Sequence, residues 1–187
     1  MSRPAVALKR MVESLDRLGI GDCVVGSVAS SVYGTPRTTM DIDMVTDIRQ
    51  DQLPALAAEL QGAFYADVDM MQDSWKHGRA FNVIHFASSH KIGIFPLSGD
   101  EYSQEAFGRR VPGTQDGPGL PYAIATAEDT ILNKLRWYRS GGENSEVQWN
   151  DLRGMLRVTG SRVDREYLSR WAPQIGVADL LERLLNE

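Results

Sequence analysis

The spacing of apolar side chains alternates between two periods along the first hundred residues. Apolar positions three and four residues apart predict helices over residues 5–18, 28–33, 51–61 and 68–78. Short apolar runs between glycine or polar residues predict strands over residues 23–25, 41–46 and 64–65, and a hairpin from the runs 81–86 and 91–97. We therefore predict an α/β (α+β) fold, in which helices flank a small mixed sheet.

A different pattern begins near residue 126. Thr126-Ala-Glu-Asp129 resembles a helix N-terminus, because acidic side chains follow a threonine in the first turn. Helices separated by short turns are predicted from there to residue 187. We expect a mixed α/β part over residues 1–125 and a helical part over residues 126–187 that packs against its cleft. Residues 98–121, rich in Gly, Pro, Asp and Arg, are predicted to form a loop with a short strand near Arg110.

Composition and charge argue against several classes of protein. The 187 residues carry a formal net charge of −5, which disfavours nonspecific attraction to polynucleotides. Cys23 is the only cysteine, so neither a disulfide framework nor a thiolate metal cluster can form within the chain. The charged start differs from a signal peptide, and no apolar run approaches the roughly 18 residues of a membrane span. We expect a protein of the reducing cytoplasm.

Two carboxylates lie one residue apart on the predicted strand 41–46. Side chains alternate along a strand, so Asp41 and Asp43 share one face while Ile42 and Met44 pack on the other. Their Cα atoms are expected roughly 6–7 Å apart, at about 3.3 Å per residue. Carboxylate oxygens are ligands that Mg²⁺ and Mn²⁺ prefer. The pattern favours a site for one or two divalent cations.

Gly26-Ser27 precedes this pair, where a predicted strand meets a short helix. Its backbone N–H groups and the Ser27 hydroxyl are suited to hold a phosphate at the positive end of the helix dipole. Gly26 has no Cβ to obstruct such a ligand. Arg37 and Thr38, just before the acidic strand, are candidates for contact with the same polyanion. The phosphate site, the cation site and the basic residue thus fall within 18 residues.

Each of these features also has a purely structural explanation. Gly26-Ser27 alone is compatible with an ordinary strand-to-helix turn, and Arg37 with a solvated loop residue. The carboxylate pair alone is compatible with solvated acids on an edge strand. Their joint occurrence in this order favours the functional interpretation.

The order Gly-Ser, thirteen residues, Asp-Ile-Asp resembles the signature of the nucleotidyltransferase superfamily related to DNA polymerase β. The runs 81–86 and 91–95 resemble the hairpin that follows the active-site strands of those enzymes. Residues 126–151, with Lys134-Leu-Arg-Trp-Tyr-Arg139 and Gln148-Trp149-Asn-Asp151, resemble the helical half of a bacterial group. That group is akin to the abortive-infection nucleotidyltransferases, which include toxins of type IV toxin–antitoxin pairs. The resemblance extends over nearly the whole chain.

The resemblance implies an Mg²⁺-dependent (or Mn²⁺-dependent) transfer of a nucleoside monophosphate from an NTP to an acceptor, with release of pyrophosphate. It places metal ions at Asp41 and Asp43, and the β- and γ-phosphates at Ser27 and nearby amides. It also places Lys134 near the phosphates as a catalytic residue, with Asp151 close by. The acceptor stays open between RNA, protein and small molecule, and the bacterial group implies a toxin or antitoxin partner.

Helical spacing gives Lys134 and Asp151 a second interpretation. Lys134 borders an apolar stripe on the helix from residue 127, and a charge in such a place needs a partner or a ligand. The predicted face that carries Asp151 on the next helix also carries Val147, Met155 and Val158. Two explanations stay open for Asp151: an ion pair with Lys134 or Arg136 that joins the two helices, or a place beside the nucleotide.

Further polar and aromatic residues have less specific patterns. Arg109-Arg110 is a candidate for contact with an acceptor or for simple solvation. The tryptophans occupy helical positions and are expected in the core or at helix interfaces; they are Trp75, Trp137, Trp149 and Trp171.

Gly93 departs from the family that the chain resembles. Those enzymes carry a third carboxylate on the strand after the hairpin, and in Lys91-Ile-Gly-Ile-Phe95 a glycine takes its place. Strand alternation puts Gly93 on the face away from Ile92 and Ile94, where the third ligand is expected. Two functions stay open: a nucleotidyltransferase with weakened chemistry, or a catalytically impaired nucleotide-binding or partner-binding protein of the same fold.

Overall fold

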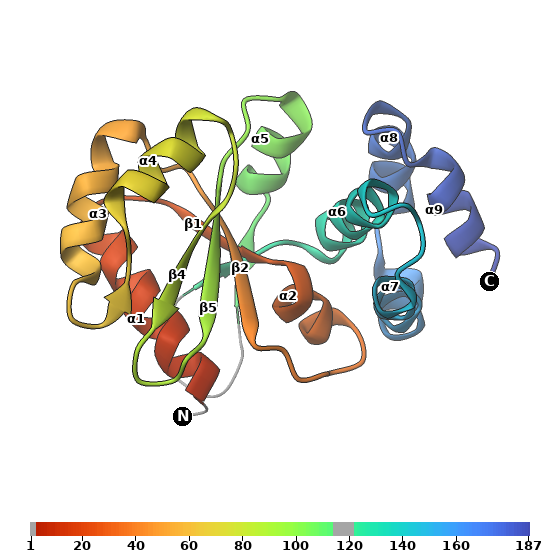
Figure 1. Cartoon of the computed structure of the whole chain (residues 1–187). Coiled ribbons are helices and arrows are strands. Elements are labelled where there is room, and N and C mark those ends of the chain that lie inside the picture. The colour runs from red at the N-terminus through yellow and green to blue at the C-terminus, as the bar shows by residue number, and fades with distance from the viewer. Residues whose placement is uncertain (1–2, 114–121) are drawn as a thin grey trace.

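The computed structural model describes residues 3–113 and 122–187, which form one sheet with helices on both sides (Figure 1). The strands are β1 (Asp22–Val25), β2 (Asp41–Thr46), β3 (Phe64–Tyr65), β4 (Phe81–His85), β5 (Lys91–Pro96), β6 (Val111–Pro112) and β7 (Ala123–Ile124). The α-helices are α1 (Arg3–Arg17), α2 (Gly26–Tyr33), α3 (Leu53–Leu60), α4 (Val68–Lys76), α5 (Glu101–Gly108), α6 (Ala127–Ser140), α7 (Glu146–Thr159), α8 (Arg165–Gln174) and α9 (Ala178–Leu185). The predicted α/β class is confirmed.

The strands follow the order β3-β4-β5-β2-β1-β7-β6 in a mixed sheet. Strand β2 is antiparallel to β1 and parallel to β5, and β4 and β5 form the predicted hairpin. The register places Asp43 between Val25 of β1 and Gly93 of β5. Residues that are far apart in the sequence therefore meet in the middle of the sheet.

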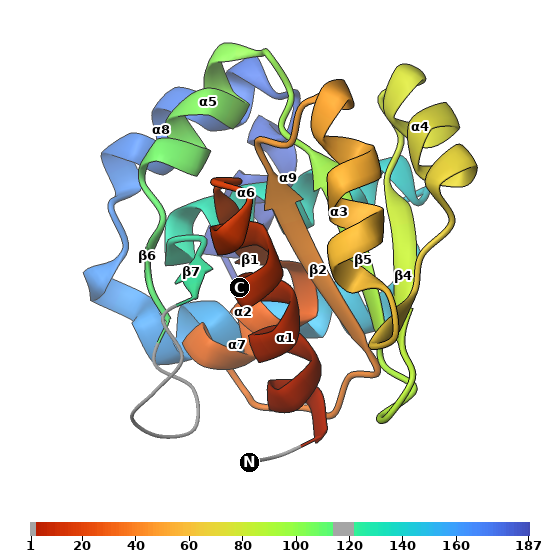
Figure 2. The ribbon, with the colours of Figure 1, turned by 90° about the vertical axis from the view of Figure 1, so that its left-hand side faces the viewer.

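Helices α1, α3 and α4 cover one face of the sheet (Figures 1 and 2). The alternation along β2 explains this, since Ile42 and Met44 are buried in the core on that side while Asp41 and Asp43 belong to the opposite face. Fully buried side chains of this core include Met11, Leu15, Leu53, Leu56, Met71, Phe81, Ile92 and Ile94. Each such side chain stabilises the fold by about 1.5–3 kcal/mol. A shift of one residue in the pairing of a strand would turn all its buried side chains to the opposite face of the sheet, so the register is fixed.

Helices α6 to α9 pack around a second hydrophobic cluster on the other side of the sheet (Figure 1). Its buried members include Ile131, Leu135, Leu152, Met155, Leu168, Trp171, Leu181 and Leu184. The predicted start of α6 is confirmed, because the Thr126 side chain accepts a hydrogen bond from the backbone N–H of Asp129. The domain division at residue 126 stays a prediction. Among the described residues, no helix is long and apolar enough to cross a membrane.

The prediction of an irregular loop after residue 98 is wrong for α5. Asp100 accepts a hydrogen bond from the Ser103 N–H at 2.9 Å and so caps the helix. Tyr102 and Ala106, one turn apart, are buried against the C-terminal helices. Because α5 has only eight residues, about two helical turns, the helical spacing of its apolar side chains is hard to detect in the sequence. The short strand expected near Arg110 is confirmed as β6, and residues 114–121 of the same prediction lie outside the described residues.

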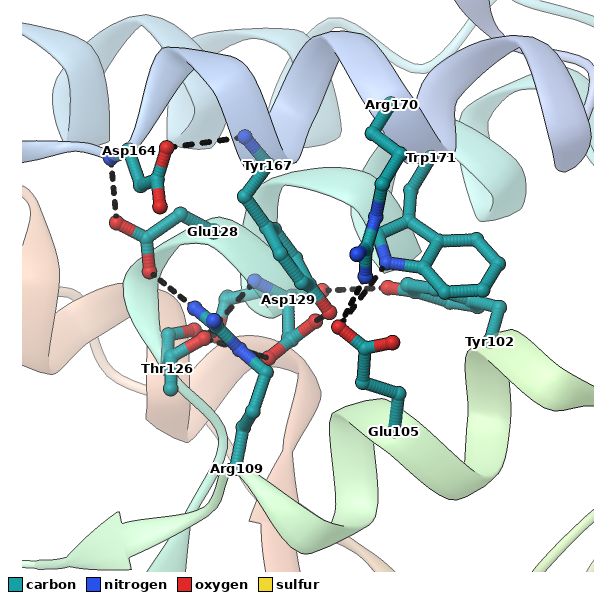
Figure 3. Close-up of polar contacts among 11 residues, drawn as sticks. Tyr102, Glu105, Arg109, Thr126, Glu128, Asp129, Asp164, Tyr167, Arg170 and Trp171 are labelled. Carbon is teal, nitrogen blue, oxygen red and sulfur yellow. Dashed lines mark hydrogen bonds and ion pairs between the residues drawn. The ribbon is translucent and has the colours of Figure 1, made fainter.

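A buried polar network joins α5 to α6 and α8 (Figure 3). The fully buried carboxylate of Asp129 accepts hydrogen bonds from the Thr126 hydroxyl at 2.6 Å and the Tyr167 hydroxyl at 2.7 Å. Arg109 donates to Asp129 at 3.4 Å and to Glu128 at 3.5 Å, and its guanidinium lies 3.7 Å from the centre of the Tyr167 ring. The network therefore holds α6, the helix that carries Lys134, against its neighbours.

A second buried acid, Asp22, lies at the start of β1 and is 8% exposed. Burial raises the pKa of Asp22 to about 6, although a hydrogen bond from the Ala123 backbone opposes the change. Thr46 is its partner across the β1–β2 ladder, and among the described residues neither Asp22 Oδ2 nor Thr46 Oγ1 has a hydrogen-bond partner. The charged form of Asp22 is thus unfavourable in the folded state.

We expect Asp22→Asn to stabilise the protein at pH 7 by about 1–3 kcal/mol. A carboxyl whose pKa is raised by folding binds more protons in the folded state than in the unfolded state. Wild type therefore loses stability as the pH rises from about 3.8, the ordinary pKa of an aspartate, to about 6, the pKa of Asp22 in the folded protein. The gain from Asp22→Asn should therefore be small at pH 4 and largest above pH 6. Chemical denaturation of both proteins across this range measures it, with the exposed Asp69→Asn as control. A constant difference at all pH values would contradict the expectation.

Candidate functional site

The turn from β1 into α2 packs directly against the acidic strand. Gly26, the first residue of α2, has φ of +65°, and a Cβ at this position would lie 2.5 Å from Asp43 Oδ2. Both the backbone conformation and the contact distance require glycine. The predicted phosphate turn and the predicted acidic strand are therefore neighbours in space. The Asp43 carboxylate lies against the N-terminus of α2.

Asp41 and Asp43 belong to the sheet face opposite the α1–α3–α4 core. Lys91, the cross-strand neighbour of Asp41 on β5, forms an ion pair with it at 3.3 Å. Burial raises the pKa of Asp43, and the charge of Asp41 raises it further, while Lys91 and Lys134 oppose both effects. The two lysines are the counter-charges that a carboxylate pair needs. Burial of Asp43 and mutual repulsion therefore make the two negative charges unfavourable, and a bound cation would relieve this electrostatic cost.

Four candidate residues form one polar chain across the site. Arg37 donates to the Ser27 hydroxyl at 2.5 Å and to both carboxylate oxygens of Asp151 at 3.1–3.3 Å. Lys134 donates to Asp151 Oδ2 at 2.8 Å. Burial alone would raise the pKa of Asp151, but the hydrogen bonds from Arg37 and Lys134 hold it below its ordinary value. One carboxylate thus fixes two cations beside Ser27.

The structure selects among the ion pairs considered for Asp151. Lys134 forms the pair that joins α6 to α7, and both side chains are less than a tenth exposed. Arg136 forms no ion pair with any described residue. The predicted face of α7 is confirmed for the buried Met155 and wrong for Val147 and Val158, which are about half exposed; Trp149 and Leu152 are buried with Met155 instead. Helical spacing misled here because the helix packs through a stripe turned from the one chosen.

A cleft of about 590 Å³ lies between the sheet and the helices that follow it. Gly26, Ser27 and Asp43 line one side, together with Phe95 of β5. Lys134 and Trp137 of α6 line the other, with the first turn of α7. Volumes of this size accommodate small-molecule ligands.

The sequence prediction is wrong for Trp137. It was expected in the core or at a helix interface but is 55% exposed at the cleft, where its ring meets Phe95 edge to face with centroids 5.6 Å apart. Asp151 does not appear among the described residues that line the cleft; its carboxylate contacts Arg37 and Lys134, which do. No hydrogen bond joins the exposed Thr38 to the other candidates within the described chain. Arg109 belongs to the Asp129 network instead.

The donor set fits a hard divalent cation. Asp41 and Asp43 supply carboxylate oxygens, and no three side chains of His, Cys, Asp or Glu gather into a metal-binding group among the described residues. Gly93 lies beside this pair, and a Cβ at position 93 would crowd the Asp43 carboxylate, since it would lie 3.1 Å from Asp43 Oδ1. Oxygen ligands of this number suit Mg²⁺ or Mn²⁺, which commonly take one or two carboxylates and complete their shells with water and phosphate.

The arrangement of sheet, helices and cleft is a fold found in nucleotidyltransferases. The solution structure of the antibiotic-resistance factor ANT(2'')-Ia is similar with a TM-score of 0.61 and 13% identity, over 98% of this chain and 99% of that chain. The crystal structure of ANT(2'')-Ia in complex with adenylyl-2''-tobramycin gives 0.60 and 14%, over 93% and 97%. An antigenic nucleotidyltransferase-like protein from Paracoccidioides brasiliensis gives 0.56 and 14%, over 97% and 91%.

These likenesses show the fold alone, because the sequence identities are low. No family model matches the chain, and none of the curated proteins does. The nucleotidyltransferase fold expected from the Gly-Ser and Asp-x-Asp pattern is thus supported.

Proposed function

We propose that this protein is an Mg²⁺- or Mn²⁺-dependent nucleotidyltransferase that moves a nucleoside monophosphate from an NTP to an acceptor. The observation that carries the proposal is the contact of Asp43 with Gly26, which joins an acidic strand to a glycine turn at a helix N-terminus. The fold supports the same reaction class. One protein of this fold was solved with an adenylylated small molecule, adenylyl-2''-tobramycin.

The chain's own groups are suited to hold the triphosphate. The backbone N–H groups at Gly26 and Ser27 open α2, and the Ser27 hydroxyl faces the same cleft. Lys134 and Arg37 bring two positive charges to this cleft, where they neutralise phosphate oxygens. Asp151 acts as a positioning residue. Its carboxylate holds the side chains of Arg37 and Lys134, and Asp151 is not one of the described residues that line the cleft.

Asp41 and Asp43 are the residues that would hold the metal. When bound there, a divalent cation supplies positive charge to the reacting phosphate and its leaving group. Lys91 keeps Asp41 paired in the free protein and so balances the charge of the pair. Its release from Asp41 leaves a second oxygen donor beside Asp43.

A second candidate function follows from Gly93. Where similar enzymes carry a third carboxylate, this chain carries none, which favours slow transfer or a nucleotide-binding or partner-binding protein without competent chemistry. The abortive-infection and toxin–antitoxin branch, and with it a toxin or antitoxin partner, stays a proposal that rests on the sequence of α6 and α7. The acceptor is open between RNA, protein and small molecule.

The test is a transfer assay with α-³²P-labelled NTPs. Each NTP is incubated with the protein, Mg²⁺ or Mn²⁺, and bulk tRNA, cell extract proteins or hydroxyl-bearing small molecules. We expect label to reach one acceptor class with wild type and not with Asp41→Ala/Asp43→Ala. Metal-dependent NTP binding without transfer would support the second candidate. Absence of metal-dependent NTP binding would overturn the proposal.

A further inference from the structure

Three adjacent strands place Asp43, Gly93 and Asn82 side by side. The register pairs Asp43 of β2 with Gly93 of β5, and Gly93 with Asn82 of β4. Directly paired residues of neighbouring strands project to the same face. The Asn82 side chain therefore belongs to the face that carries Asp41 and Asp43.

Gly93 is closely surrounded by two side-chain oxygen atoms and by the Phe95 ring. A Cβ at position 93 would lie 3.1 Å from Asp43 Oδ1 and 3.5 Å from Asn82 Oδ1. Asn82 is exposed, and its side-chain amide makes no hydrogen bond with any described residue. Its oxygen is therefore free of protein partners among the described residues and can bind a ligand.

We propose that Asn82 supplies a further oxygen donor to the divalent cation held by Asp41 and Asp43, in the place that a third carboxylate would take. This inference rests on the proposed function and names a ligand for its metal. Amide oxygens, like carboxylates, are donors that hard cations accept. Asn82 Oδ1 and Asp43 Oδ1 both lie beside Gly93, which places no side chain between them.

A neutral donor also suits the electrostatics of the site. Asp41 and Asp43 already place two carboxylates on this face of the sheet, one residue apart along β2. A carboxylate at position 93 would add a third negative charge within contact distance of Asp43, whereas the Asn82 amide adds an oxygen without charge. The metal-free site is thereby less strained, and the cation is held less tightly than by three acids.

A packing explanation for Gly93 leads to a different expectation. The Phe95 ring would lie 3.4 Å from a Cβ at position 93, so the glycine also makes room for this aromatic side chain. If packing is its only role, Asn82 has no effect on the cation. Mn²⁺ binding to Asn82 variants separates the two explanations.

The experiment titrates the protein with MnCl₂ and measures free Mn²⁺ by electron paramagnetic resonance. We expect Asn82→Ala to weaken Mn²⁺ binding about tenfold, in the range measured when a group that supports a metal site is removed. Asn82→Asp should bind Mn²⁺ more tightly than wild type, because it keeps the oxygen and adds charge. Asn150→Ala, an exposed asparagine on α7, is the matched control and should bind as wild type does. Thermal melts confirm that each variant is folded.

A double-variant comparison tests whether Asn82 fills the vacated place. Gly93→Asp should raise Mn²⁺ affinity, and in that background Asn82→Ala should change the affinity less than about twofold, since one place holds one donor. Equal losses in both backgrounds would overturn the proposal. Asp43→Asn distinguishes failure of the Asn82 proposal from failure of the proposed function. If Asp43→Asn abolishes Mn²⁺ binding while Asn82→Ala binds as wild type, Asn82 has no such role and the proposed function stands. If Asp43→Asn binds as wild type, both fail.

Discussion

Asp41→Asn/Asp43→Asn is expected to lower nucleotidyl transfer by about a thousandfold or more while the folded structure persists. The loss follows from removing the two carboxylates that would hold the cation, since charge stabilisation at phosphate accounts for several kcal/mol of the barrier and each 1.36 kcal/mol is tenfold in rate. Binding of an NTP should lose its dependence on Mg²⁺ in the same variant. Single-turnover assays and equilibrium binding with and without Mg²⁺ measure both effects.

The same variant should be at least as stable as wild type without metal. Asp43 carries a raised folded pKa, chiefly because it is buried and then because Asp41 lies near. Ionisation of Asp43 therefore lowers the stability of the protein as the pH rises above 3.8, the ordinary pKa of an aspartate, and through the raised pKa of the folded state. Asparagine removes this penalty, so the melting temperature without metal should stay level or rise at neutral pH.

Mg²⁺ should then distinguish the two proteins. Wild type is expected to gain melting temperature with Mg²⁺ and an NTP, because a ligand that binds only the folded state stabilises it. The variant should not. A marked fall in its metal-free stability would instead indicate that the pair supports the fold, with Lys91 as its structural partner.

The contact between the phosphate turn and the acidic strand can be predicted from the sequence. Gly26 directly follows β1, and Asp43 belongs to β2, the next strand along the chain; period-two alternation decides which face Asp43 takes. The choice of Lys134 as a charge beside an apolar stripe is equally local, since helical spacing places it. These features follow from short-range geometry, which a sequence carries directly.

Other parts of the site depend on which distant elements become neighbours. Asn82 joins the site only through the register of β4 on β5, and no spacing in the sequence singles it out. Trp137 has the spacing of a core residue but lies on a helix face that the fold leaves at the cleft. Arg37 is a loop residue whose contact with Asp151 spans 114 positions. Such contacts are set by tertiary packing rather than by propensity or period.

The Asp129 network is a further example of a feature that spacing does not reveal. Arg109 has the appearance of an exposed basic pair with Arg110, and only the structure shows that it lies over Tyr167 and meets the carboxylates of α6. Burial, followed by the hydrogen bond to Asp129, raises the pKa of Tyr167, so its hydroxyl keeps its proton and donates a hydrogen bond to the carboxylate. The network thus combines a buried charge with fixed donors.

Asp129→Ala is expected to lower the free energy of unfolding by about 3–5 kcal/mol. The substitution removes the shared acceptor of the Thr126 and Tyr167 hydroxyls and one of the two carboxylates that pair with Arg109, and removal of one partner from a buried ionic group costs this much. Tyr167→Phe, which removes a single hydrogen bond to the same carboxylate, should cost only about 1–2 kcal/mol.

Urea denaturation of the wild-type protein and both variants measures these losses. Glu166→Ala, an exposed acid in the first turn of α8, is the matched control and should change stability by no more than about 0.5 kcal/mol. Because Asp129 and Lys134 share α6, Asp129→Ala should also weaken NTP binding under conditions where the variant is still folded, whereas Glu166→Ala should not. A loss below about 1 kcal/mol in Asp129→Ala would mean that water replaces the carboxylate without cost, and that the network does not hold α6 in place.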